Sequence, residues 1–273
     1  MTLGEARHCA VERSQDLVYQ DGHDYTVGSP HLRHADLRKR INSQITGAIS
    51  EVLQRQGTCA VLEIGAGHGF FTDTVLASGG TATVTEMSSA SSEYLTERYR
   101  DCADVRVVHD VDGNAPFKEN AAYDVILLIS VIHHIPDYLE VITRLCDSVL
   151  RPGGMVVTFQ DPVWYPRQKR WARGLSLGSY FAWRITQGEV RRGLTARLRR
   201  LRGVYSDTDP SDLVEYHVVR QGVDDLALLD LFRLRFADVE VDRYFSTQSP
   251  QLQRVFEKYV PPNTFGIVAR GHN

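Results

Sequence analysis

The chain has 273 residues, 42% of them apolar and 24% charged, which is the balance of an ordinary soluble globular protein. This composition excludes a disordered, collagen-like or disulfide-scaffold protein, and no apolar run approaches the roughly 20 residues of a membrane helix. The four cysteines, Cys9, Cys59, Cys102 and Cys146, lie far apart and have no metal-binding spacing. Because the first residues also lack the apolar core of a secretory signal, we expect reduced thiols and a cytoplasmic location.

Residues 1–58 are expected to form an N-terminal cap. An apolar residue recurs at every fourth position, at Leu37, Ile41, Ile45, Ile49 and Leu53. This spacing predicts a helix over residues 37–53, packed on the edge of a sheet. Residues 25–34 contain glycine, proline and two histidines, so we expect either a surface connection or a cap over a ligand site.

Strand and helix signals alternate from residue 59 onward. Short apolar or β-branched runs predict strands over residues 59–64, 81–85, 105–109, 123–130, 155–159, 239–245 and 265–269. Apolar residues at helical spacing predict one helix over residues 135–149, ended by Pro152-Gly153-Gly154, and another over residues 224–236. This alternation favours an α/β fold with a doubly wound parallel sheet and helices on both faces.

Charge is unevenly distributed along the chain. Residues 163–222 contain twelve Arg or Lys against five Asp or Glu, a net charge of +7, whereas the remainder contains nineteen against twenty-nine, a net charge of −10. We therefore interpret residues 163–222 as a segment inserted into an acidic core made of residues 59–162 and 223–273.

A glycine-rich turn, Gly65-Ala66-Gly67-His68-Gly69, directly follows the first predicted strand. Its G-x-G-x-G spacing differs from the G-x-G-x-x-G of dinucleotide sites, because position 70 is Phe, so a pyrophosphate-binding turn is disfavoured. Glu86 lies 21 residues after Gly65 at the end of a strand, where a carboxylate can accept both hydroxyls of a ribose. Together the turn and Glu86 predict a nucleoside-binding crevice.

Five motifs occur in order between residues 55 and 160. They are Val61–Gly69, Glu86, Asp110–Phe117, Tyr123–Asp137 and Leu150–Gly154. Their sequence and spacing resemble those of the class I S-adenosylmethionine-dependent methyltransferases of small-molecule type. The resemblance implies S-adenosyl-L-methionine as cofactor and a seven-stranded, Rossmann-like sheet that is mostly parallel, with an antiparallel last strand. No metal site is expected.

The resemblance also implies where the methionine part of the cofactor binds. Gly65, Ala66 and Gly67 would pass beneath it, and Glu63 would lie near its amino group, a suitable partner for a cation. Ser130, at the end of the fourth strand, would lie beside the sulfonium through its backbone oxygen. The acidic core suits a ligand that carries a positive sulfur.

For the nucleoside part, the resemblance implies that Glu86 binds the ribose hydroxyls, with Met87 beside it. Asp110 would accept a hydrogen bond from the adenine amino group, and Val111 would offer its backbone N–H to the ring. Asp112 is close enough in sequence to compete for the role of Asp110, and the sequence does not separate the two.

Histidines are the informative residues for catalysis, because hydroxyl nucleophiles usually need a proton removed. His133 and His134 follow the fourth strand, where histidine can either stiffen the loop or act in catalysis. His133 occupies the position at which plant-type small-molecule O-methyltransferases carry their base, so it is our first candidate. His217 is the second, because Tyr216 and His217 could touch the acceptor; His134 and His31 follow.

The inserted segment is expected to form a lid over the acceptor site. Its first third contains six aromatic residues, Trp164, Tyr165, Trp171, Tyr180, Phe181 and Trp183. They would either line a pocket for an aromatic substrate or form a small satellite core. Residues 191–202 predict a basic amphipathic helix, which is either a solvated face or a binding site for an acidic acceptor, a membrane surface or nucleic acid. Nucleic acid is disfavoured by the negative net charge of the chain.

The sequence therefore predicts a methyltransferase that modifies a small molecule, at a hydroxyl oxygen of a secondary metabolite or sugar-like compound in natural product biosynthesis. The alternatives are an N- or C-methyltransferase on the same scaffold and a non-catalytic S-adenosylmethionine-binding protein. The sequence fixes neither the acceptor, nor the methylated atom, nor the oligomeric state.

Overall fold

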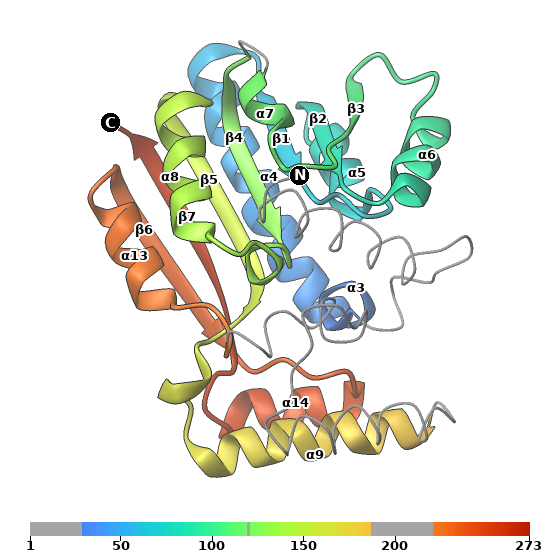
Figure 1. The fold of residues 1–273 in the computed structure, drawn as a ribbon, viewed down its shortest axis with the longest axis vertical. Helices are drawn as coiled ribbons and strands as arrows, with labels where there is room; N and C mark the ends of the chain where they lie inside the picture. Colours follow the sequence, from blue (N-terminus) through green and yellow to red (C-terminus); the bar gives the residue numbers. More distant parts are fainter. Residues whose placement is uncertain (1–28, 119–120, 187–220) are drawn as a thin grey trace, which may run out of the picture.

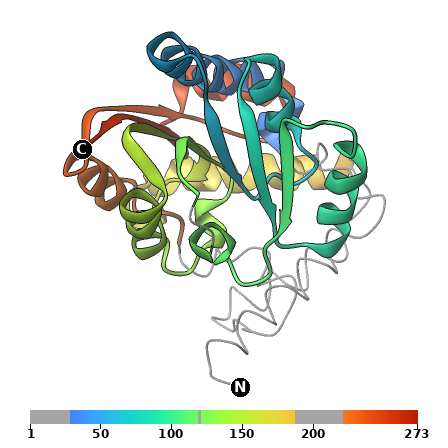
Figure 2. The same ribbon diagram turned by 90° about the horizontal axis from the view of Figure 1, so that it is seen from above.

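A computed structural model describes residues 29–118, 121–186 and 221–273. Its centre is one seven-stranded sheet with helices on both faces (Figures 1 and 2). The strands are β1 (Ala60–Ile64), β2 (Thr81–Glu86), β3 (Val105–His109), β4 (Tyr123–Ile129), β5 (Leu150–Pro162), β6 (Phe236–Tyr244) and β7 (Thr264–His272). Their order is β3-β2-β1-β4-β5-β7-β6, and β7 runs antiparallel to both neighbours. This confirms the predicted doubly wound sheet with an antiparallel last strand.

Helices cover the two faces of the sheet. One face carries α4 (Ala35–Gln56), α5 (Phe70–Ala77) and α6 (Ser89–Arg98), and the other carries α8 (Tyr138–Ser148) and α13 (Asp225–Arg233). The shorter elements are α3 (Pro30–Arg33), α7 (Ala115–Lys118) and the 3₁₀ turns η1 (Ile132–His134) and η2 (Tyr165–Arg167). Two further helices are α9 (Arg170–Thr186) and α14 (Pro250–Tyr259). The three predicted helices correspond to α4, α8 and α13.

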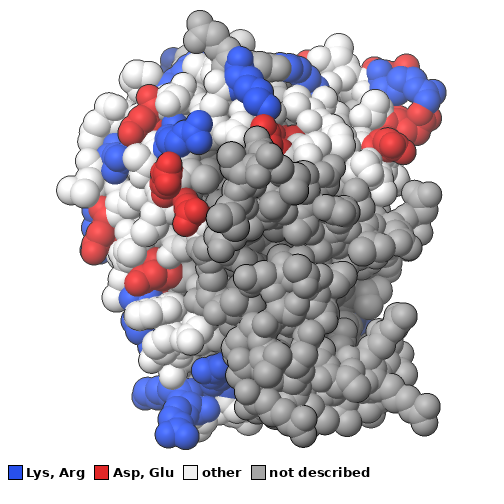
Figure 3. Space-filling view, in the orientation of Figure 1, with Lys and Arg blue, Asp and Glu red and all other residues white. Residues whose placement is uncertain are grey.

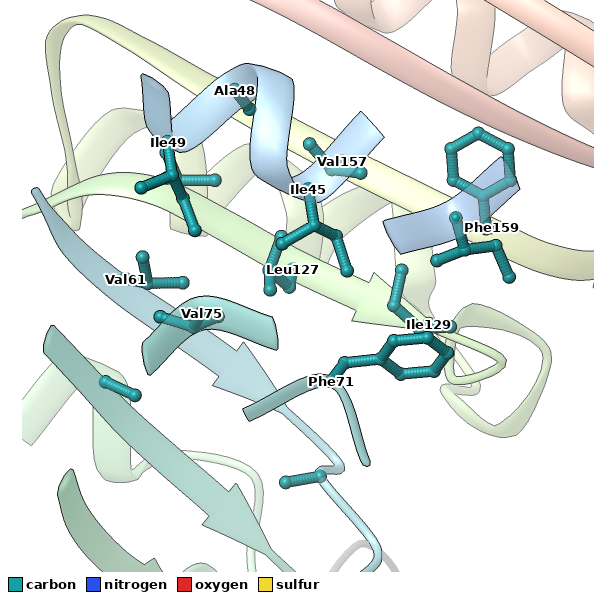
Figure 4. Packing of buried hydrophobic residues seen from close by; sticks show 14 of the residues in the cluster. Ile45, Ala48, Ile49, Val61, Phe71, Val75, Leu127, Ile129, Val157 and Phe159 are labelled. Carbon is teal, nitrogen blue, oxygen red and sulfur yellow. The ribbon is translucent and has the colours of Figure 1, made fainter. Parts of the chain in front are cut away.

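The position of α4 corrects one expectation. Its apolar stripe does not pack on a sheet edge but on the middle of one face, where Ile45 and Ile49 belong to one buried cluster with Val61, Leu127 and Val157 (Figure 4). The central parallel strands carry apolar side chains on both faces of the sheet, so each face must be covered by helices, and α4 covers one of them. Burying each such side chain contributes about 1.5–3 kcal/mol, so α4 is part of the core and not an appendage.

Residues 29–34 form no surface connection. Pro30 begins the short helix α3, and its neighbours His31 and Leu32 are both buried. Strand β5 also differs from its predicted span of 155–159. It begins at Leu150, which pairs with Tyr123 of β4. A register shift then accommodates Pro152-Gly153-Gly154, and pairing resumes between Val125 and Met155.

Part of the predicted insert follows β5 directly as η2 and α9. Figure 3 shows acidic and basic side chains interspersed over most of the described surface in that view, with basic side chains gathered at the start of α9. The predicted basic helix over 191–202, Tyr216, His217 and residues 1–28 lie outside the described residues. Within the described ranges, no helix is both long and apolar enough to cross a membrane.

Candidate active site

The glycine turn lies at the carboxyl ends of β1 and β2. The backbone N–H groups of Gly65 and Ala66 donate to the Thr85 carbonyl, at 2.9 and 3.2 Å. Gly65 has a φ of +67°, and a Cβ there would stand 2.8 Å from the Val131 side chain, so only glycine fits. Gly67 also has a positive φ and leads into the start of α5. The backbone is therefore bent so that a ligand can approach it without side chains in the way.

Glu86 closes this turn from the end of β2. Its buried carboxylate accepts hydrogen bonds from the backbone N–H groups of Gly67, Met87 and Ser88, at 2.8, 3.0 and 3.2 Å. Burial raises the pKa of Glu86, although these three donors act in the opposite direction. A carboxylate has about four acceptor positions, so Glu86 can hold the turn and still accept from a ligand hydroxyl.

Asp110 and Asp112, which the sequence left as alternatives, lie in different surroundings. Asp110 is buried at the end of β3; its N–H donates to the Glu86 carbonyl at 2.8 Å, and its carboxylate accepts from the Ala115 N–H at 3.0 Å. Asp112 instead lies at the surface and pairs with Lys118 at 2.9 Å, which lowers the pKa of Asp112. Asp110, followed by Val111, is therefore the one beside Glu86.

Glu63 lies beneath the glycine turn on β1. It is almost fully buried, and its carboxyl accepts a hydrogen bond from the Thr72 hydroxyl at 2.6 Å. Burial raises the pKa of Glu63 to about 8, so the group is mostly uncharged at neutral pH. A cation bound nearby would favour the ionised form.

The ends of β4 and β5 meet in an unusual backbone arrangement. Ser130 and Gln160 both have positive φ angles, 62° and 68°, although neither is glycine. The Ser130 N–H donates to the Phe159 carbonyl at 2.7 Å, which joins the two strand ends. Such backbone conformations cost about 1–3 kcal/mol each and concentrate at functional sites.

His133 and Asp161 form a largely buried pair at this junction, with side chains 9% and 0% exposed. The Asp161 Oδ1 atom lies 2.7 Å from His133 Nδ1 and also accepts the backbone N–H of His133 at 3.1 Å. Asp161 is fully buried. Because a carboxylate oxygen only accepts, Nδ1 carries the proton and Nε2 carries the lone pair of the neutral imidazole. The pair therefore presents a histidine in the tautomer that a general base requires.

A β-bulge turns Asp161 toward His133. The register between β5 and β7 shifts between Thr158 and Asp161, with Gln160 at the bulge. The Gln160 side chain donates to Ser246 at 2.8 Å, and its N–H donates to the Tyr244 hydroxyl at 3.1 Å, so the bulge is held in place. Bulges next to active sites commonly redirect a side chain in this way. The sequence analysis ended this strand at residue 159 and missed Asp161, although an acidic residue just past an apolar strand was a usable signal.

Burial determines the charge state of the pair. It lowers the pKa of His133 to about 3 and raises the pKa of Asp161 well above its usual value. Burial keeps the imidazole neutral, and the hydrogen bond from the His133 backbone opposes the effect of burial on Asp161 by favouring its ionised form. The ring of His134 lies 4.0 Å from that of His133, centre to centre.

Other candidates are placed less centrally. Trp171 is 51% exposed, and Trp164 and Tyr165 lie under the guanidinium groups of Arg167 and Arg173. Three of the predicted lid aromatics therefore have local packing partners or face solvent. Across the described ranges, no group of three His, Cys, Asp or Glu side chains is arranged to hold a metal ion.

Comparisons with known proteins find a methyltransferase domain in part of this chain. Residues 62–156 match the family model of a methyltransferase domain. Equisetin synthetase of Fusarium heterosporum is 29% identical over 128 residues, which cover 44% of this chain and 3% of that protein. The polyketide synthase component of lovastatin nonaketide synthase from Aspergillus terreus is 32% identical over 120 residues, covering 41% and 4%. The chain thus spans only a small fraction of these relatives.

Solved structures share the fold over nearly the whole chain. The N-methyltransferase NodS from Bradyrhizobium japonicum, crystallised with S-adenosyl-L-homocysteine, has a TM-score of 0.55 at 14% identity and covers 97% of this chain and 98% of its own. The CurJ carbon methyltransferase has a TM-score of 0.56 at 15% identity, with 98% and 68% covered. At such low identity these structures establish the fold alone.

The fold is the Rossmann-like fold of class I methyltransferases, and residues 62–156 are its methyltransferase domain. Residues 62–156 are similar to the S-adenosylmethionine-dependent methyltransferases. The chain's own residues fit that cofactor, because the turn at Gly65 leaves no room for a Cβ and Glu86 places a buried carboxylate at the end of β2.

Proposed function

We propose that the protein transfers a methyl group from S-adenosylmethionine to a hydroxyl oxygen of a small molecule. S-adenosylmethionine supplies a methyl group bound to a positive sulfur, an electrophile that needs no further activation. The task left to the chain is to orient two reactants, exclude water and remove a proton. The observation that carries the proposal is the His133–Asp161 pair, which follows Val131, the residue that packs against Gly65 of the glycine turn.

The cofactor site extends along the carboxyl ends of four strands. Glu63 accepts a hydrogen bond from the amino group of the methionine part. Glu86 accepts hydrogen bonds from the ribose hydroxyls, and Asp110 accepts one from the adenine amino group. The remaining positions act through the backbone and are Gly65, Ala66, Gly67, Met87, Val111 and Ser130. The burial of Glu63, Glu86 and Asp110 supports these roles, because buried carboxylates need partners that can compensate for lost hydration.

His133 is the general base in this proposal. Its Nε2 atom accepts the proton of the acceptor hydroxyl as the methyl–oxygen bond forms and the methyl–sulfur bond breaks. Asp161 is a positioning residue, because it acts through His133: its Oδ1 atom holds the imidazole in the required tautomer and stabilises the imidazolium that results. His217 stays a second candidate for contact with the acceptor.

A second candidate is transfer to carbon. It is favoured by the similarity to polyketide synthases and, in fold, to a carbon methyltransferase. A carbon acid next to a carbonyl also needs a base, so the pair serves both chemistries, whereas a neutral amine acceptor needs none. The polyketide synthase relatives favour a role in natural product biosynthesis. The three described free cysteines support a cytoplasmic location.

Mass spectrometry of metabolite extracts, incubated with the protein and deuteromethyl-labelled S-adenosylmethionine, tests this function. We expect a product that gains one labelled methyl group, and NMR of that product separates an O-methyl from a C-methyl group. His133→Gln should abolish the product while calorimetry still detects cofactor binding. If the protein binds no S-adenosylmethionine, both transfer to oxygen and transfer to carbon are excluded. Binding without any product would favour a non-catalytic role.

A further inference from the structure

We propose that His31, on the short helix α3, binds a second oxygen of the acceptor beside the atom that receives the methyl group. The site would then select acceptors that carry two neighbouring oxygen functions. This inference rests on the proposed methyl transfer, and it deepens that function by naming a substrate class.

The first observation is an unsatisfied polar atom. His31 is 5% exposed, and its Nδ1 atom has no hydrogen-bond partner among the described residues. The Oδ2 atom of Asp161, on the buried pair, is in the same state. Buried polar atoms are normally paired, and leaving one unpaired costs about 1–3 kcal/mol. Each of these atoms is therefore available to a ligand that reaches it.

The second observation is where His31 lies. Its ring stacks on Phe71, with centroids 5.9 Å apart, and Phe71 belongs to the first turn of α5 just after the glycine loop. Figure 4 shows Phe71 beside Ile129, at the end of β4. The two imidazoles are close enough that a positive charge on His31 would lower the pKa of His133. His31 therefore lies in the region of the cofactor loop and of the proposed base.

The third observation is that α3 is anchored. The ring of His34 lies 2.5 Å from the Thr247 carbonyl, and Leu32 is buried in the core. The His31 side chain is thus held in one position before any ligand binds. A preorganised hydrogen-bonding group loses little entropy when it engages a substrate.

The chemistry of a neutral imidazole fits this role. Burial lowers the pKa of His31 to about 3, so the ring is uncharged and offers one donor and one acceptor. When the acceptor hydroxyl gives its proton to His133, negative charge develops on its oxygen. A neutral His31 that binds the neighbouring oxygen orients the acceptor for this transfer and does not compete for the proton.

A pair of isomers tests the proposal without knowledge of the natural acceptor. Catechol has neighbouring hydroxyls and hydroquinone has opposite ones, with identical composition. Ligand-observed NMR on the full chain, loaded with S-adenosylhomocysteine, measures the affinity of each. We expect catechol to bind at least about tenfold more tightly. His31→Phe keeps the aromatic stack on Phe71 and should remove this preference, whereas His31→Asn returns a polar atom near the Nδ1 position and should restore part of it.

His272→Phe is the matched control. His272 also has a buried Nδ1 atom without a partner among the described residues. It lies at the end of antiparallel β7, where the parallel strands begin, whereas the site lies where they end. The preference for catechol should survive there. Equal affinity for the isomers, no binding of either, or a preference retained in His31→Phe overturns the proposal. Calorimetry with S-adenosylhomocysteine is the separate check, because failure to bind it would contradict the proposed function itself.

Discussion

Replacing Asp161 by Asn tests the buried pair most directly. The amide keeps the size of the side chain and retains an oxygen at Oδ1, which the backbone N–H of His133 at 3.1 Å favours in that position. The imidazole therefore keeps its orientation and tautomer. What the variant loses is the negative charge opposite the imidazolium that forms when His133 takes the proton.

The size of that loss follows from the geometry. Two unit charges about 4 Å apart at an effective dielectric constant of about 20 interact by roughly 4 kcal/mol. The amide oxygen replaces part of this interaction, so a loss of about 2–4 kcal/mol is expected, which lowers kcat by about 30- to 1,000-fold. Because Asp161 is fully buried, little screening by solvent reduces the effect. The KM for the cofactor should stay near the parental value.

The pH dependence of kcat separates a positioning role from a purely structural one. In the parent, burial raises the pKa of Asp161, so the carboxyl is protonated at low pH and the rate rises as pH increases through that pKa. In Asp161→Asn this titration is absent, and only His133, with a pKa near 3, remains. The lower limb of the profile should therefore move to acidic pH. An unchanged profile at near-parental kcat would refute a base role for the pair.

The remaining predictions concern the cofactor and the lid. Glu86→Gln and Asp110→Asn should each weaken S-adenosylmethionine binding by about 1.5–3 kcal/mol by calorimetry, with the fold kept by circular dichroism; parental affinity in either would mean a misassigned carboxylate. The raised pKa of Glu63, about 8, predicts that binding releases a proton and tightens from pH 6 to 8, as calorimetry in buffers of different ionisation enthalpy would detect. Glu63→Gln should remove this pH dependence of binding; if the dependence persists, Glu63 is not the group that releases the proton. Trp183→Ala on α9 should raise the acceptor KM and leave cofactor affinity unchanged; equal loss of both would indicate a structural core.

Local patterns predicted the sheet because they reflect burial that the strands themselves require. All seven residues of β4 are buried, so its apolar run was visible without knowledge of its neighbours. The G-x-G-x-G turn was likewise readable, since its positive φ angles demand glycine in the sequence. Among the helices, α4 was recognisable by its stripe, but its place over the middle of the sheet depends on strand order, which the stripe does not encode.

Long-range pairing explains what the sequence did not reveal. Asp161 and His133 are 28 positions apart, and nothing in either segment names the other. His31 lies still farther away, in a helix of four residues that a glycine- and proline-containing segment obscured. Its place becomes visible only in the fold, where its ring stacks on Phe71 just after the glycine loop.

The strained backbone connects these findings. Ser130 and Gln160 each hold a positive φ that glycine would adopt at no cost, yet neither is glycine. A strain of about 1–3 kcal/mol at each persists only if the surrounding contacts fix it, and Gln160 has such contacts with Ser246 and Tyr244. Those contacts orient the next residue, Asp161, into a dry site, where burial opposes its charge. Two unfavourable features, a strained bulge and a buried carboxylate, thus converge on one imidazole, and packing alone gives no reason for either. Both follow if the purpose of this junction is to hold His133 ready to accept a proton.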